Sequence, residues 1–333
     1  MNSLSLKSSC YRAAVCLLAC LWLPATGQAQ KLLRLVRYAD SLLNERYQNP
    51  DIDTLYITRP KTKWTFTARI NVSGATLETR GVDNGLPFRS EMNADYKSTV
   101  SLGVNYLGMA LSLSLNPGKL LGRYHDYEVG LNSYRNRWGF DFFYQDASNF
   151  TGWYEGNGMP RIELPPEVLS MKSFNVNAYY AFNYRRFSYP AAFSQSFVQQ
   201  QSAGSLLLGF SLQGQRSRTE GNHESLLKVF NVGLGAGYGY NWVPHRRWLF
   251  HLSALPTLTV YSNTSLSVDD DRISLDYHFP EVIITVRGAI IRQFGNMFAG
   301  ATMVYNFTNV GDHNKLSVYH SKWHLRLLFG YRL

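Results

Sequence analysis

Apolar and polar residues alternate strictly over long stretches of this chain. From Trp64 to Val72 every second residue is apolar, and the residues between them are threonine, arginine or asparagine. The same period recurs in residues 138–144, 174–182 and 323–333. A period of two places successive side chains on opposite faces of a β-strand. The pattern therefore predicts long strands, each with one apolar and one polar face.

The number and length of these stretches predict a membrane barrel. Most exceed the roughly 9–11 residues that a tilted strand needs to cross lipid. We expect an all-β fold, a transmembrane antiparallel up-and-down β-barrel of about 12 strands in the cell outer membrane of a Gram-negative bacterium. The strands are expected near 62–73, 96–106, 107–116, 123–134, 137–147, 171–184, 202–216, 226–240, 247–262, 273–292, 296–309 and 318–333. Tight turns are expected near Tyr106 and Gly295, with longer polar loops at 74–95, 117–122, 148–170, 217–225, 263–272 and 310–317.

A soluble β-sandwich is the main alternative, because its strands also alternate. Sandwich strands are usually shorter, at about 5–6 residues. Trp, Tyr and Phe make up 14% of this chain, and several lie near the ends of the expected strands. Aromatic girdles of this kind are typical of membrane barrels. No later segment reaches the roughly 18 consecutive apolar residues of a membrane helix, so we do not expect a helical membrane protein.

The first 29 residues have the composition of an export signal. Lys7 and Arg12 precede the apolar stretch 13–23, and small residues at 27–29 suit cleavage after Ala29. Lipoprotein processing at Cys20 is the alternative. All three cysteines of the chain lie in this segment. The mature protein is then free of cysteine, which excludes thiol catalysis and cysteine metal sites.

Two segments outside the expected strands have helical features. Residues 30–61 are expected to form a periplasmic N-terminal segment, with an amphipathic helix at 31–48. Residues 185–201 fall on the periplasmic side, where turns should be short. We expect a short helix there, capped by Ser188 with Pro190 in its first turn, that folds under or into the lumen. Its aromatic residues form a possible periplasmic gate: Phe187, Phe193 and Phe197.

Several stretches resemble a known family. They are 53–57 (DTLYI), 101–114 (SLGVNYLGMALSLS), 137–145 (RWGFDFFYQ) and 186–205 (RFSYPAAFSQSFVQQQSAGS). The family comprises uncharacterised outer-membrane β-barrels of Bacteroidetes-type bacteria, grouped as a domain of unknown function. The resemblance implies a fold and a location, and it implies no reaction.

The search for catalytic chemistry gives one weak candidate. His251 and Ser253 share a strand face, with Asn263 as a distant third member of an outer-membrane phospholipase-type arrangement. Alternation places the pair inside the barrel, whereas a lipid-cleaving pair should reach the outer face. We therefore expect no enzyme, no catalytic residues and no cofactor. The run Asp269–Asp271 is interpreted as a solvated loop rather than a metal site.

The expected lumen carries mixed charges and a stripe of glycines. The charged residues should pair across the lumen, because burying an isolated charge costs free energy. They are Arg69, Asp126, Glu128, Asp141, Glu281, Arg287 and Arg326. The glycines are Gly233, Gly235, Gly237 and Gly239. They could give space for the 185–201 segment to pack, leave a groove for solute, or only relieve crowding of side chains in a filled barrel.

Three functions remain open from the sequence. The first is a narrow channel or transport-related, porin-like pore with a periplasmic constriction. The second is a non-conducting structural or interaction barrel that binds an unknown periplasmic or surface protein, and the third is a lipid hydrolase. The formal net charge of +10 does not indicate nucleic acid, because the aromatic residues should face lipid. Expected partners are outer-membrane lipid, lipopolysaccharide and the barrel-insertion machinery.

Overall fold

A computed structural model of the chain describes residues 51–333 except 84, 107–108, 116–125, 149, 157, 167, 220–224, 269–270, 276–280 and 313–315. The expected signal peptide and the expected helix at 31–48 lie outside the described residues, as do residues 269 and 270 of the Asp269–Asp271 run. The side chains of Asp126 and Glu128 are also outside the described set.

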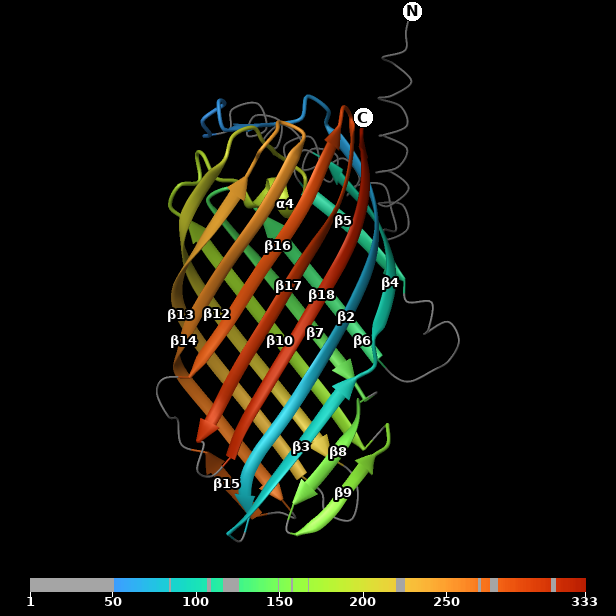
Figure 1. Cartoon of the computed structure of the whole chain (residues 1–333), viewed down its shortest axis with the longest axis vertical. Coiled ribbons are helices and arrows are strands. Elements are labelled where there is room, and N and C mark those ends of the chain that lie inside the picture. The colour runs from blue at the N-terminus through green and yellow to red at the C-terminus, as the bar shows by residue number, and fades with distance from the viewer. Residues whose placement is uncertain are drawn as a thin grey trace, which may run out of the picture. The chain divides into compact units, whose positions relative to one another are not determined.

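The described part of the chain consists almost entirely of strands (Figure 1). They are β1 (Ile57–Thr58), β2 (Trp64–Asp83), β3 (Leu86–Ala94), β4 (Lys97–Tyr106), β5 (Met109–Leu115), β6 (Asp126–Tyr134), β7 (Trp138–Ala147), β8 (Phe150–Gly156), β9 (Met159–Leu164), β10 (Leu169–Ala181), β11 (Val198–Gln199), β12 (Ala203–Thr219), β13 (Ser225–Trp242), β14 (Trp248–Val268), β15 (Asp271–Leu275), β16 (Val282–Phe294), β17 (Met297–Asp312) and β18 (Leu316–Arg332). One short helix, α4 (Tyr189–Phe193), lies between β10 and β11.

Antiparallel pairing joins the strands into one curled 16-stranded sheet that forms the barrel wall. A continuous path of neighbours runs β6–β7–β10–β12–β13–β14–β16–β17–β18–β2, and β2 then pairs with β4, which pairs with β5. These twelve strands correspond to the twelve expected from the sequence. Tyr106 pairs with Met109, so β4 and β5 are neighbouring antiparallel strands where the sequence predicts a tight turn.

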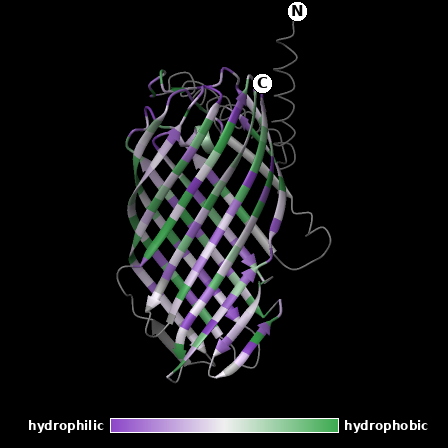
Figure 2. Ribbon diagram, in the orientation of Figure 1, coloured by the Kyte–Doolittle hydropathy of each residue, from purple (hydrophilic) through white to green (hydrophobic). Residues whose placement is uncertain are grey.

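The outer surface of the wall is apolar. Figure 2 shows hydrophobic and hydrophilic segments alternating along the long strands. Large apolar side chains point outward at every second position of β18, where Leu325, Leu327 and Phe329 are exposed, and Leu206, Leu252 and Leu258 are exposed on β12 and β14. Monomeric soluble proteins rarely expose so much contiguous apolar surface, whereas a barrel that spans a membrane requires it. None of the described residues forms a helix long and apolar enough to cross a membrane.

Two expected loops are strands instead. The sequence prediction of loops at 74–95 and 148–170 was wrong, because β2 continues to Asp83 and returns as β3, and β8 pairs with both β3 and β9. Gly85 provides the positive φ (80°) of the β2–β3 turn, which other residues rarely adopt. The expected strand 273–292 is also divided, into β15 and β16, and both pair with β14. In β2 beyond Val72 the outward side chains Thr76, Glu78 and Arg80 are polar, whereas apolar Leu77 faces inward, so the outward apolar face on which the strand predictions depended is missing there.

The interior consists of an apolar cluster toward each end of the barrel with a polar layer between them. Along β18, inward side chains pass from Val318 in one cluster, through His320, Lys322, His324 and Arg326, to Leu328 in the other. The first cluster contains Ala75, Leu77, Met92, Ala147, Phe150 and Met171. The second surrounds α4, near the barrel end where the C-terminus lies.

A membrane location predicts a large difference between two substitutions of exposed apolar residues. Leu252→Arg, on β14, should destabilise the folded barrel by about 2–4 kcal/mol, because a charge would face the hydrocarbon. Ile162→Arg, on the β8–β9 hairpin, should change stability by less than about 0.5 kcal/mol. The measurement is urea unfolding of the protein refolded into lipid vesicles. Equal effects of the two substitutions would contradict this placement of the apolar surface.

Candidate functional site

The connection between β10 and β12 folds back into the barrel. We call residues 183–200 the plug. Ser188 caps α4 by accepting a hydrogen bond from the Ala191 amide, and Pro190 lies in the first turn, as the sequence predicts. Gln195 follows the helix with a φ of 59°, a left-handed conformation that is common just after a helix end. The helix ends at Phe193, so Phe197 lies beyond it.

The plug fills one end of the lumen with aromatic side chains. Phe187 and Tyr189 are completely buried, and Phe193 and Phe197 are 6–7% exposed. Gly239 on β13 lies directly beneath this packing, because a β-carbon there would approach the Phe187 Cζ atom to 2.8 Å. The other glycines of the stripe have a different surrounding: β-carbons at Gly235 and Gly237 would meet the backbone of β14, and none of the four lines the cavity described below.

A chain of four polar side chains joins the plug to the wall. His251 Nδ1 lies 2.7 Å from Asn241 Oδ1, and His251 Nε2 lies 3.0 Å from Ser253 Oγ. The Tyr189 hydroxyl donates to Ser253 Oγ at 2.7 Å. The third member of the predicted Ser–His–Asn set was therefore wrong. Asn263 lies exposed further along β14, whereas Asn241, on the neighbouring β13, pairs directly with His251 across the strands.

Further hydrogen bonds hold the plug along its length. The Asn241 amide donates to the Ser188 carbonyl at 3.0 Å and to Gln199 Oε1 at 2.9 Å. Ser188 Oγ also donates to Asn136 Oδ1, in the β6–β7 turn, at 2.7 Å. At the other end of the helix, Arg332 Nη2 donates to the Gln195 carbonyl at 3.3 Å. Strands far apart in the wall therefore contact the same short segment.

Residues 51–58 pack against the plug. In this segment β1 pairs with β11 of the plug, and the Asp53 amide donates to the Arg185 carbonyl. Asp51 accepts hydrogen bonds from the Tyr184 hydroxyl at 2.9 Å and from Arg185 Nε at 2.9 Å. The Tyr184 hydrogen bond, followed by the Arg185 contact, lowers the pKa of Asp51, so the carboxylate stays ionised at neutral pH.

A polar cavity of about 420 Å³ lies between the two apolar clusters. Tyr134 and Phe193 border it on the side of the plug, and Val318 borders it on the opposite side. Much of the remaining wall is amide and hydroxyl side chains, including Asn71, Asn132, Asn175, Asn177, Gln213 and Thr302. Cavities of this size hold small organic molecules in other proteins.

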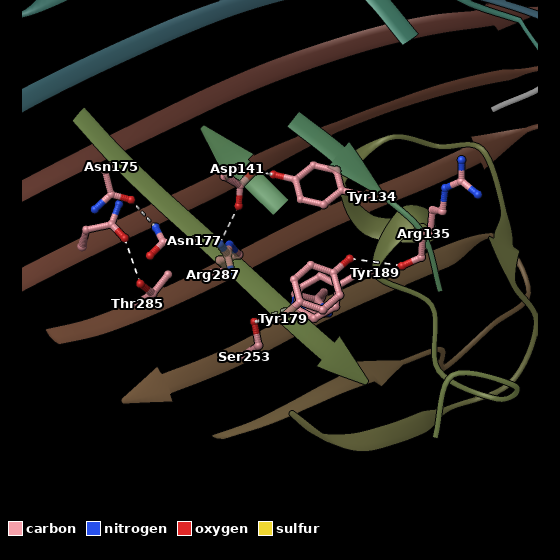
Figure 3. Close-up of polar contacts among 12 residues, drawn as sticks. Tyr134, Arg135, Asp141, Asn175, Asn177, Tyr179, Tyr189, Ser253, Thr285 and Arg287 are labelled. Atoms are coloured by element: carbon pink, nitrogen blue, oxygen red, sulfur yellow. Dashed lines mark hydrogen bonds and ion pairs between the residues drawn. The ribbon is translucent and has the colours of Figure 1, made fainter. Parts of the chain in front are cut away.

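The predicted charge network forms only in part. Arg287, which is 2% exposed, contacts Asp141 at 2.6 Å, and the Tyr134 hydroxyl donates to the same carboxylate (Figure 3). Glu281 accepts instead from the Gly311 amide at 3.1 Å. Arg326 Nε donates to Asn71 Oδ1 at 2.7 Å, and Arg69 has no hydrogen-bond acceptor among the described residues. The strand register explains the difference, because it sets Arg326 opposite Asn71 and Arg69 opposite Ser101.

The polar network predicts that Asn241 is important for stability. Asn241→Ala removes the contacts to His251, Ser188 and Gln199, and it should lower the free energy of unfolding by at least about 2 kcal/mol, because buried polar groups lose their partners. The matched control is Asn263→Ala, which should change it by less than about 0.5 kcal/mol. Urea unfolding in vesicles measures both. An Asn241→Ala variant as stable as the control would show that the network does not hold the plug.

Comparison with known proteins identifies the family of this chain. No curated protein sequence matches the chain at a significant level. Among the solved structures that resemble the chain is the outer-membrane protease OmpT from Escherichia coli, at 7% identity and a TM-score of 0.43, with 83% of this chain and 98% of that chain covered. The transport unit of the autotransporter AIDA-I from Escherichia coli matches at 12% identity and a TM-score of 0.35, with 83% and 91% covered. The outer-membrane protein OprG from Pseudomonas aeruginosa matches at 12% identity and a TM-score of 0.28, with 82% and 97% covered. At these identities and scores the likenesses say nothing about activity. Residues 51–333 match a family described as a domain of unknown function, and the chain therefore belongs to this family, DUF4421.

Proposed function

We propose that this protein is an outer-membrane channel for small polar solutes that is held closed by its own plug. The observation that supports the proposal is the polar cavity of about 420 Å³ enclosed between two apolar clusters. Burying charged groups costs several kcal/mol unless they are paired, and an apolar core would be at least as stable. A barrel with only a structural role gains nothing from such a layer, whereas a transport path for polar solutes needs one.

The plug can move out of the lumen without disrupting the strand pairs of the wall. It is an insertion between β10 and β12, and these strands pair with each other directly from Leu169↔Thr219 to Ala181↔Leu207. Among the described residues, the plug is held by side-chain packing, hydrogen bonds, the ion pairs of Arg185 and Arg186 with residues 51–53 and the short β1–β11 pair. A change that weakens these contacts would open one end of the lumen while every pair of neighbouring strands stays joined.

The proposed location is based on the exposed apolar surface and on which segments lie at the same end of the barrel. The exposed apolar side chains face outer-membrane lipid, and basic residues near the outer rim meet lipopolysaccharide phosphates. The plug, residues 51–58 and the C-terminus lie at one end of the barrel, which we place on the periplasmic side. The exposed aromatic residues Phe329 and Tyr331 of β18 are the proposed signal for the barrel-insertion machinery.

The test is single-channel conductance in planar bilayers of the refolded mature protein beside a variant that lacks 187–200. We expect rare, brief openings from the wild type and a higher, steadier conductance from the deletion variant. The deletion is tolerable because Ala181 and Leu207 remain paired beside it. Because the first cluster narrows the other end, the deletion is also combined with Phe150→Ala and Met171→Ala, two fully buried residues of that cluster.

A reversible lock provides the matched control. The side chains of Ser188 and Asn136 are in contact, so Ser188→Cys with Asn136→Cys should join plug and wall by a disulfide. The variant is refolded without residues 1–29, which contain all three native cysteines. Openings should disappear when this variant is oxidised and return on reduction. If neither the deletion variant nor the triple change conducts, while heat-modifiable migration shows folded barrels, the channel proposal is wrong.

A second function, ester hydrolysis, is favoured by one observation. His251 lies within hydrogen-bond distance of both Ser253 Oγ and Asn241 Oδ1, the relative arrangement that activates a serine nucleophile. If Asn241 accepts the Nδ1 proton, Nε2 is free to accept the proton of Ser253. The three side chains are at most 4% exposed beneath the plug, and Tyr189 occupies the serine oxygen. Hydrolysis would therefore require the plug to move.

Labelling with a fluorophosphonate tests this second function. The wild type should remain unlabelled, whereas the variant lacking 187–200 should be labelled at Ser253, and addition of Ser253→Ala should abolish the label. Absence of label in the deletion variant would show that the three residues only hold the plug.

A further inference from the structure

The cavity contains more positive than negative side chains. Its described lining includes Arg69, Lys97, Arg287, Lys322 and Arg326, with Asp141 as the carboxylate. That carboxylate already accepts from Arg287 and from Tyr134. Within the described lining, neither Arg69 nor Arg326 forms an ion pair with Asp141.

Arg69 and Arg326 lie side by side on the wall. Arg326 is directly opposite Asn71 in the β2–β18 pair, and Arg69 is two residues from Asn71 on the same face of β2. Diagonal neighbours of this kind are within reach of long side chains. Two guanidinium groups therefore share one part of the cavity wall.

Most of the hydrogen-bonding capacity of this pair is unused. A guanidinium has five N–H donors, and Arg326 uses its Nε on Asn71 Oδ1 at 2.7 Å. The Asn71 amide is held in turn by Thr99 and Ser101, at 3.0 Å and 2.8 Å, which fixes the acceptor in place. Among the described residues, the η nitrogens of Arg326 and all the nitrogens of Arg69 have no acceptor.

Such an arrangement is complementary to an oxyanion. Adjacent like charges repel, and the repulsion is strong where protein shields them from water. A carboxylate or phosphate placed between the two groups would relieve it and would accept paired, charge-assisted hydrogen bonds. The amide and hydroxyl side chains across the cavity, among them Asn132, Asn175 and Thr302, are partners for hydroxyl groups.

We propose that Arg69 and Arg326 form a binding site for the oxyanion group of a small polyhydroxylated solute, such as a sugar acid or a sugar phosphate. The hydroxyl groups of the solute occupy the amide-lined part of the cavity. This inference rests on the proposed channel function, because it names the class of solute that the path accepts.

The experiment measures stabilisation by ligand and does not depend on opening of the plug. The full barrel is refolded in the presence of glucose 6-phosphate, glucuronate or neutral glucose at equal ionic strength, and urea unfolding is then followed. A ligand that binds only the folded state raises the midpoint as its concentration rises. We expect the two anions to raise the midpoint of the wild type and glucose to leave it unchanged. Stabilisation by one anion alone would assign the site to a phosphate or to a carboxylate.

Arg69→Gln is the principal variant, since Arg69 forms no hydrogen bond with the described residues and its replacement breaks none. The apparent affinity should fall at least tenfold, and Arg69→Lys should retain part of it. Arg161→Gln, which removes an exposed arginine on the β8–β9 hairpin, is the charge-matched control and should bind as the wild type does. Equal stabilisation by glucose, unchanged binding in Arg69→Gln or no stabilisation of the wild type would each overturn the proposal. Those outcomes leave the conductance result standing, so the two proposals fail separately.

Discussion

The structure depends on one constraint, which is that every backbone N–H and C=O group in the hydrocarbon of a membrane must have a hydrogen-bond partner within the protein. The long antiparallel ladders of the wall satisfy these groups. From Leu316↔Gly81 to Arg332↔Thr65, for example, β18 and β2 pair without interruption. Once the backbone is satisfied by neighbouring strands, the outward side chains must be apolar. The inward side chains are released from that requirement, and function can develop only there or at the ends of the barrel.

The inward side chains are used in two different ways. Near the C-terminal end, the wall leaves space beside Gly239 and Leu207 for the aromatic side chains of the plug, and the polar chain from Asn241 to Tyr189 fixes the position of the plug. Further along, the same strands carry amides, hydroxyls and guanidinium groups around a cavity. The two parts meet at Arg287, which binds Asp141 in the cavity wall and lies opposite Ser253 in the strand ladder. A movement of the plug would therefore alter side-chain packing at the edge of the cavity.

The Ser–His–Asn contact has the distances of a catalytic arrangement, yet a structural role is sufficient to explain it. Its distances suit nucleophilic catalysis, but the serine oxygen accepts a hydrogen bond from a fully buried tyrosine of the plug. In the structure two of these three side chains, Asn241 and Ser253, form hydrogen bonds with buried polar groups of the plug, including the Ser188 carbonyl. The network is thus sufficiently explained as a connection between plug and wall, and hydrolysis would require the plug to move.

The sequence alone determined the barrel, because alternation of apolar and polar residues directly reports which face of a strand meets lipid. It also indicated the capped helix at Ser188 and placed Arg69, Arg287 and Arg326 toward the lumen, since these features depend on local spacing. Only the tertiary structure decided which inward residues meet. The pairing of Asn241 with His251, the partner of Asp141 and the proximity of Arg69 to Arg326 are set by strand register, which also brings together Arg326 and Asn71, 255 positions apart. The hairpins β2–β3 and β8–β9 escaped prediction for a related reason: the outward side chains of this part of β2, among them Thr76, Glu78 and Arg80, are polar, so the outward apolar face by which the other strands were identified is missing.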